Sequence, residues 1–103
     1  MGANIHSFEL TIRAGESGLH VENDNVDVEI TLENGEKYSA TFFTLTNIEM
    51  LFKKNRLTGE CNAGLYFWAT DMILVETLTE KVIRDAIIGL IFSDEIGTAL
   101  TKL

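Results

Sequence analysis

Apolar and polar residues alternate along two neighbouring stretches of the chain, 26–32 and 37–43, which an Asn-Gly pair separates. The apolar positions are Val26, Val28, Ile30 and Leu32 in the first stretch and Tyr38, Ala40 and Phe42 in the second. Alternation with a period of two residues indicates a β-strand with one buried face. The pattern therefore predicts a β-hairpin with one face for a core and one face for water or a partner.

The phase of the two strands decides which turn joins them. A two-residue Asn34-Gly35 turn would leave the two apolar sets on opposite faces of the hairpin. A three-residue loop over 33–35, with Gly35 as a left-handed bulge, brings them to the same face. The pairs that this loop predicts are Ile30 with Tyr38, Val28 with Ala40, and Val26 with Phe42.

The sequence pattern predicts three further strands. Residues 8–13 alternate between apolar and polar and predict a half-buried strand. The runs 65–68 and 72–75 are continuously apolar, which is typical of central strands covered on both faces. The polar stretch 14–25 predicts a loop, with a short extra strand at 19–22 as the alternative.

Helical periodicity appears after residue 43. Thr46 with Glu49 and Thr77 with Glu80 both match the capping-box pattern, and apolar residues follow each at helical spacing. We expect helices over about 47–55 and 78–92. After Ser93 we expect a last amphipathic helix, with Ile96, Ala99, Leu100 and Leu103 on one face, that covers the end of the long helix. These elements predict a single α+β domain, 1–103, with a mainly antiparallel sheet of about five strands and two or three helices packed on it.

The long helix loses its polar face in its second half. Ile88 and Phe92 stand where charged residues would be expected. Either the last segment or a second copy of the protein has to cover them. They are the candidate residues for self-association, as a homodimer for example.

Charge is distributed unevenly. The formal net charge is -8, and residues 1–36 hold eight acids against Arg13 alone, a net charge of -7. Nucleic acid is excluded as a ligand on this basis, because phosphate binding depends on Lys and Arg. A basic protein partner is the better match, although acids also serve simply to keep a protein soluble. The candidate partner-binding residues are Glu22, Asp24, Asp27, Glu29, Glu33 and Glu36.

No catalytic, cofactor or metal motif appears in the chain. The two histidines and the single cysteine, Cys61, lie at no spacing that forms half a zinc site. One cysteine cannot form an internal disulfide, which favours a reducing compartment. No apolar run approaches the roughly 20 residues that span a bilayer, and no leader pattern opens the chain. We expect a soluble cytoplasmic protein that binds no membrane and is not an enzyme.

The length, charge and expected order of elements in this chain resemble those of a known family. A short acidic domain with a strand meander and a closing apolar helix resembles the small immunity proteins encoded beside secreted bacterial toxins, in contact-dependent inhibition or polymorphic toxin systems. The segments that carry the resemblance are Thr58-Gly59-Glu60, Tyr66-Phe67-Trp68 and Asp71-Met72-Ile73. The resemblance implies a cytoplasmic inhibitor that binds a cognate toxin, often a basic nuclease. The competing hypotheses are an oligomeric structural subunit and a small-molecule pocket between the aromatic strands and the long helix.

Overall fold

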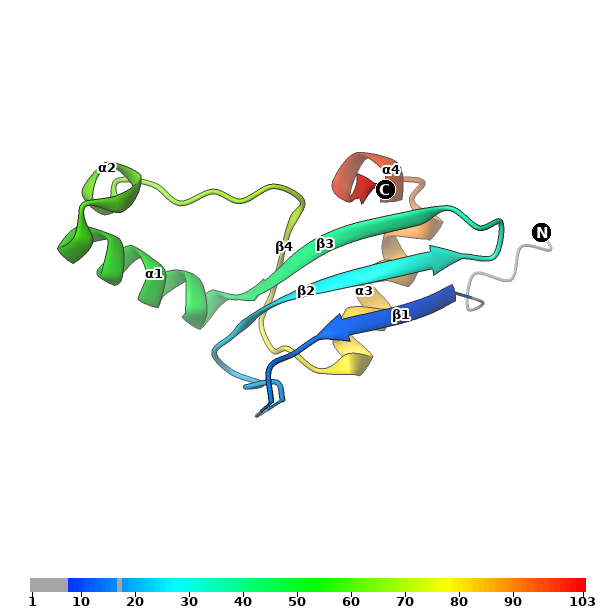
Figure 1. The fold of residues 1–103 in the computed structure, drawn as a ribbon, viewed down its shortest axis with the longest axis horizontal. Coiled ribbons are helices and arrows are strands. Elements are labelled where there is room, and N and C mark those ends of the chain that lie inside the picture. Colours follow the sequence, from blue (N-terminus) through cyan, green and yellow to red (C-terminus); the bar gives the residue numbers. More distant parts are fainter. Residues whose placement is uncertain (1–7, 17) are drawn as a thin grey trace.

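The computed structural model describes residues 8–16 and 18–103, and Figure 1 shows their fold. The elements in chain order are β1 (Phe8–Arg13), β2 (Asn25–Leu32), β3 (Lys37–Thr44), α1 (Leu45–Thr58), α2 (Glu60–Gly64), β4 (Met72–Val75), α3 (Glu80–Phe92), α4 (Ile96–Ala99) and β5 (Thr101–Lys102). The predicted α+β class is confirmed. Residues 19–22 form a loop and turn, so the alternative of an extra strand there is wrong.

The sheet has the order β1-β2-β3-β4, and β5 also pairs with β3. The pairs β1–β2, β2–β3 and β3–β5 are antiparallel, whereas β3 and β4 run parallel. The number of strands agrees with the prediction, and β1 to β4 were each predicted, but the fifth strand differs. The fifth strand is the C-terminal β5, and the predicted strand over 65–68 is absent.

The register of the β2–β3 hairpin confirms the bulged turn. Val26 lies opposite Phe42, Val28 opposite Ala40, and Ile30 opposite Tyr38. The Leu32 N–H donates to the Glu36 carbonyl at 2.8 Å, and the Gly35 N–H donates back to the Leu32 carbonyl at 2.9 Å. Gly35 has φ of +90°, which glycine adopts without steric cost. The three-residue loop therefore sets the phase on which the core depends.

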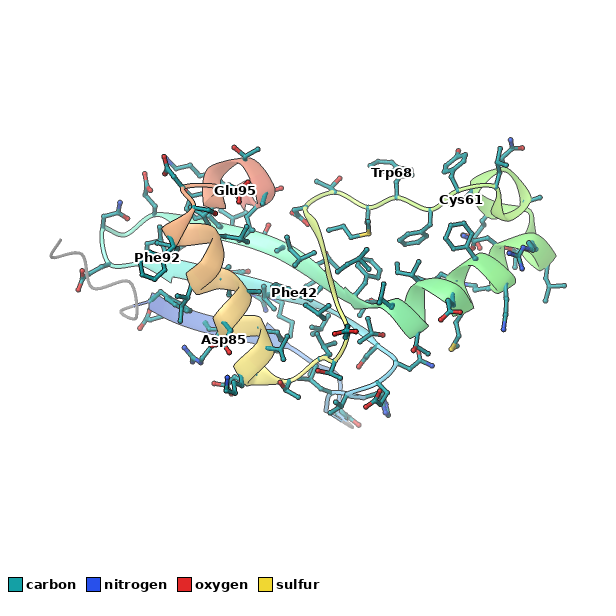
Figure 2. The ribbon with its side chains drawn as sticks, turned by 180° about the vertical axis from the view of Figure 1, so that it is seen from behind. Phe42, Cys61, Trp68, Asp85, Phe92 and Glu95 are labelled. Atoms are coloured by element: carbon teal, nitrogen blue, oxygen red, sulfur yellow. The ribbon has the colours of Figure 1, made fainter. Side chains whose placement is uncertain are left out.

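The core lies between the sheet and α3, which covers one face of it (Figures 1 and 2). Its buried residues are Val26, Val28, Ile30, Tyr38, Ala40, Phe42, Leu78, Ile83, Ile87 and Leu100. The N-cap of α3 is Thr79, whose Oγ1 accepts a hydrogen bond from the Val82 N–H at 3.1 Å. The predicted N-cap, Thr77, therefore lies two residues before the observed one. The polar side of α3 carries two ion pairs of i,i+4 spacing, Glu80–Arg84 and Lys81–Asp85.

The C-terminal segment covers part of the core, but with two short elements. α4 spans four residues, and β5 then adds to the edge of β3, with Lys102 opposite Tyr38. Leu100 is buried between these elements, while Leu103 is 63% exposed. The expected single amphipathic helix is therefore wrong after Ala99.

α1 forms where a helix was expected, yet it lies elsewhere in the molecule. It begins directly after β3, with Thr44 as its N-cap in place of the predicted Thr46, and the Thr44 Oγ1 accepts from the Asn47 N–H at 3.1 Å. It projects from the end of the sheet and does not pack on its face (Figure 1). We call residues 45–71, which include α1, α2 and the returning segment 65–71, the arm.

The tip of the arm is a tight left-handed turn. Cys61, Asn62 and Ala63 all have φ between +50° and +58°. A Cβ on the buried Gly64 would lie 2.6 Å from the Arg56 Cγ and 2.9 Å from the Phe52 carbonyl oxygen. Only glycine therefore lets the chain turn back this close to α1.

The aromatic run 65–68 was predicted as a buried strand, and the structure corrects this. Only Phe67 packs inward, edge-on to Phe43 with ring centroids 5.4 Å apart. Leu65 and Trp68 are 72% and 67% exposed. The second edge of β3 is already occupied, by β5 at 38–39 and by β4 at 41–44, so residues 65–68 find no place beside β3.

Replacement of Gly35 tests the role of the bulge. No atom lies within 4 Å of a Cβ built on Gly35, so the cost of Gly35→Ala is conformational alone, about 1–2 kcal/mol of lost unfolding free energy. Gly89→Ala in α3 is the matched control, because it also meets no atom and should stabilise the protein by about 0.5–1 kcal/mol. Urea unfolding measures both variants. Equal effects at the two positions would contradict a left-handed Gly35.

Candidate protein-binding surfaces

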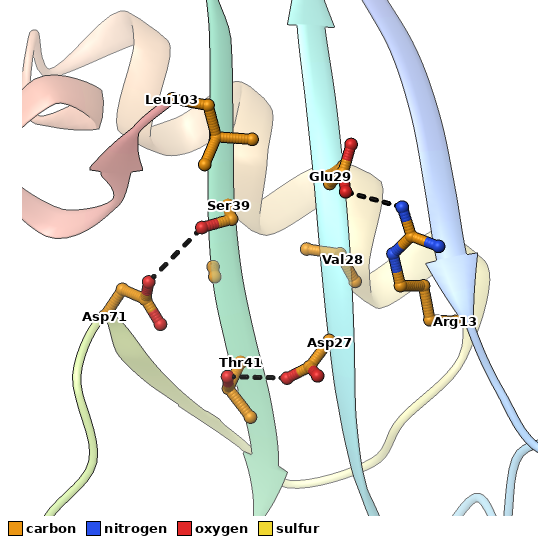
Figure 3. Close-up of a pocket in the computed structure, with 9 residues that line it drawn as sticks. Arg13, Asp27, Val28, Glu29, Ser39, Thr41, Asp71 and Leu103 are labelled. Carbon is orange, nitrogen blue, oxygen red and sulfur yellow. Dashed lines mark hydrogen bonds and ion pairs between the residues drawn. The ribbon is translucent and has the colours of Figure 1, made fainter.

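None of the helices α1 to α4 covers the face of the sheet opposite α3, and this face contains the centre of the predicted acidic surface. We call it the outer face. A depression of about 330 Å³ lies on it (Figure 3). It is lined by Arg13, Asp27, Val28, Glu29, Ser39, Ala40, Thr41, Asp71 and Leu103. Three carboxylates and one guanidinium therefore converge from β1, β2 and the end of the arm.

The two central acids are held in place by neighbouring strands. The Thr41 Oγ1 donates to the Asp27 Oδ1 at 2.8 Å. Glu29 forms an ion pair with Arg13 across the β1–β2 pair, and their hydrogen bond raises the pKa of Arg13. Figure 3 shows both contacts, together with a weaker one of 3.5 Å from the Ser39 Oγ to the Asp71 carboxylate. Glu29 therefore forms an ion pair with Arg13, whereas Asp27, which lies opposite Arg13 in the β1–β2 register, interacts with its charge at longer range.

Glu33 and Glu36 lie at the hairpin end of the sheet. Glu33 is exposed in the three-residue loop. Glu36 pairs with Lys102 of β5 at 3.0 Å and accepts a hydrogen bond from the Tyr38 hydroxyl at 3.3 Å. The contact with Lys102, followed by one with Asn34, lowers the pKa of Glu36. Glu36 therefore helps to fasten the C-terminal strand as well as adding charge.

Glu22 and Asp24 lie in the loop at the other end of β2, and only Glu22 is free to meet a partner. The Asp24 carboxylate accepts from the backbone N–H groups of His20 and Asn25. Its carbonyl accepts from the Thr44 N–H at 3.1 Å, which ties the loop to the start of α1. Because β2 has eight residues, its two ends are roughly 26 Å apart. The six predicted acids are therefore spread along the sheet and do not form one compact cluster.

The arm carries an apolar surface that the sequence pattern did not reveal. Its exposed large apolar side chains are Leu45, Met50, Leu57, Leu65, Tyr66 and Trp68. Trp68 points away from α1 in Figure 2. The continuous run 65–68 was the available signal, but a run without alternation does not indicate which of its side chains are exposed.

Lys53, Lys54 and Arg56 are exposed on α1, and none of the ion pairs formed among the described residues includes them. The arm is therefore both apolar and locally basic.

The predicted self-association residues differ in exposure. Phe92, at the end of α3, is 74% exposed, whereas Ile88 is half-buried. Of the two, Phe92 is the one that presents apolar surface to solvent.

The Glu36–Lys102 contact can be tested by its effect on titration. Lys102→Met should raise the pKa of Glu36 toward its ordinary value, because the largest cause of the lowered pKa is removed. Since the folded pKa is lowered, the contribution of Glu36 to stability is present at neutral pH and is lost as the pH falls through that pKa. Carbon-13 NMR of the carboxyl group measures the shift. Lys37→Met, which removes an unpaired neighbouring lysine, is the control and should leave the Glu36 pKa unchanged.

No helix in the described ranges has the length and apolar character needed to cross a bilayer. Over residues 8–16 and 18–103, no group of three or more His, Cys, Asp or Glu side chains is arranged to hold a metal ion. No protein-family model, curated protein or solved structure matches this chain.

Proposed function

We propose that this protein is a non-catalytic, protein-binding inhibitor, of the kind represented by bacterial immunity proteins, that neutralises a basic toxin in the cytoplasm. The observation that carries the proposal is the open outer face, where Asp27, Glu29 and Asp71 surround a depression that none of the helices α1 to α4 covers. A nuclease-like toxin binds nucleic acid through cationic groups. An acidic sheet face presents the complementary charge to the same groups.

The arrangement of the acids favours fast and specific association. A one-signed surface steers an oppositely charged partner and raises the association rate constant. The Asp27 carboxylate already accepts a hydrogen bond from Thr41, so little side-chain freedom is lost when a partner binds it. Glu29 is different, because a cationic group of the partner would have to replace or join Arg13.

The binding experiment uses the inactivated toxin domain encoded beside the gene as its probe. Asp27→Lys together with Glu29→Lys should lower the association rate constant at least tenfold, on the order expected for lost steering, and should flatten its dependence on salt. Glu49→Lys together with Glu76→Lys is the matched control, because both acids are exposed, lie off the outer face, and change the net charge equally. Stopped-flow or surface plasmon resonance measures the rates. Unchanged binding and unchanged salt dependence in the first variant would refute the proposal.

The exposed ring of Phe92 favours a second candidate function, an oligomeric subunit that self-associates at the end of α3. An exposed fraction of 74% is high for a phenylalanine beside the core elements α3 and α4. Packing of this ring against a second copy would remove apolar surface from water.

The second candidate predicts that Phe92→Glu converts an oligomer into a monomer, because a charge cannot be buried unpaired in an apolar contact. Sedimentation velocity measures the change. Leu103→Glu is the control, since its side chain is also exposed but lies on the outer face. Sedimentation of wild type and Phe92→Glu as identical species would remove the basis of this candidate.

A further inference from the structure

β1 forms one edge of the sheet. The strand order places it at the end of the path, and among the described strands it pairs only with β2. Figure 1 shows it at the margin of the sheet. An edge strand presents a row of backbone N–H and C=O groups to which another strand can bind.

The phase of the hydrogen bonds identifies the backbone groups at this edge. In an antiparallel sheet, alternate residues direct both backbone groups to the same neighbouring strand. The Leu32 N–H donates to the Glu36 carbonyl, so the even-numbered residues of β2 bond toward β3 and the odd-numbered ones toward β1. The odd-numbered residues of β2 lie opposite odd-numbered residues of β1. Phe8, Leu10 and Ile12 therefore direct their N–H and C=O groups to the outer edge.

β1 lacks the features that commonly protect an edge strand from pairing. It contains no proline, and its register with β2 is continuous over all six residues. Its side chains on the core side are apolar, so no inward-pointing charge blocks a second strand. The opposite end of the sheet is formed by β4, which has only four residues. β1 is therefore the longer of the two edges.

The sequence of β1 is complementary to itself when the strand is reversed. An antiparallel partner with Thr11 opposite Thr11 places Glu9 opposite Arg13, and Leu10 opposite Ile12. A two-fold axis makes each of these pairs occur twice. The charged pairs lie on the outer face with Thr11, and the apolar pairs lie on the core side. Shifts of two residues are the smallest that keep the faces aligned, and they leave both charges without an opposite charge directly across.

The two charged residues are able to form these cross-strand pairs. Their backbone groups bond toward β2, so at the outer edge they occupy non-hydrogen-bonded positions, where opposite side chains are closest. Glu9 is exposed and belongs to none of the ion pairs formed among the described residues. Arg13 pairs with Glu29, but its side chain is 56% exposed and its guanidinium has five N–H donors. Arg13 can therefore bind a second carboxylate.

We propose that two copies of this chain associate through their β1 strands, antiparallel about a two-fold axis at Thr11, so that their sheets join into one. The backbone groups of Leu10 in one copy bond to those of Ile12 in the other. The axis is perpendicular to the sheet, which leaves both outer faces on the same side. This contact uses other residues than the one at Phe92, and it does not depend on the proposed inhibitory function.

A disulfide at the axis tests the register. Thr11→Cys in a Cys61→Ser background leaves one cysteine per chain, and Thr11 is exposed, so the fold should be retained. Directly opposite Cα atoms are about 4.5–5.5 Å apart, within the range that a disulfide bridges. Glu9→Cys in the same background is the control, because its two copies would lie four residues apart in the register, roughly 13 Å. Under mild oxidation the Thr11→Cys protein should form a covalent dimer at least about tenfold faster, measured on non-reducing gels.

Sedimentation equilibrium tests the charged pairs without a cross-link. The wild type should form a dimer that salt weakens. Glu9→Lys places a cation opposite Arg13 at both ends of the contact and should raise the dissociation constant about tenfold. Glu49→Lys is the matched control, because it changes the net charge equally at an exposed position on α1, and it should not raise the dissociation constant.

Three results would overturn the proposal. A monomeric wild type would exclude the dimer, and protection of the β1 amides from hydrogen exchange on addition of the inactivated toxin domain would assign the edge to that partner instead. A dimer that Phe92→Glu dissociates while Glu9→Lys leaves it intact would place the interface at the end of α3. Equal rates of cross-linking at positions 11 and 9, with circular dichroism showing both variants folded, would exclude the register.

Discussion

The left-handed backbone at Gly35 is the constraint on which the rest of this structure depends. It makes the β2–β3 loop three residues long, and this length sets the phase of the two strands. A slip of one residue would turn all the apolar side chains of one strand toward water. Each of these two strands contributes three of the ten residues in the core cluster, so such a slip would remove three residues from the core beneath α3. The same phase places Asp27 and Glu29 on the opposite, outer face. The length of the β2–β3 loop therefore determines both the core and the candidate site.

Features set by local phase could be predicted from the sequence, and features set by competition between distant segments could not. The hairpin register follows from residues that are close in the chain. The fate of 65–68 depends on whether an edge of β3 is free, and that edge is occupied by β4 and by the C-terminal Thr101 and Lys102. A continuous apolar run reads the same whether it finds a strand partner or not. The sequence therefore predicted the number of strands and the place of four of them, but not the fifth, β5.

The candidate site also combines features that local sequence predicts with features that depend on distant segments. The exposure of Asp27, Glu29 and Glu33 followed from alternation and turn chemistry. The role of Asp24 could not be predicted in this way, because its hydrogen bonds join a loop to the N-terminus of α1, twenty residues away in sequence. Nor does a count of charges reveal that Glu29 meets Arg13 or that Glu36 meets Lys102. Net charge describes the long-range field of a protein, whereas the pairs decide which carboxylates remain free for a partner.

The arm is ordered although few of its residues are buried. Each ordered residue costs about 1–2 kcal/mol of backbone conformational entropy, and burial of apolar surface normally offsets this cost. Within α1 and α2 the buried residues are only Asn55 and Gly64. The edge-on contact of Phe67 with Phe43 anchors the arm at its base, but nothing comparable fastens its tip. Local stability should therefore be lower in the arm than in the sheet, because few buried apolar contacts hold the arm in place.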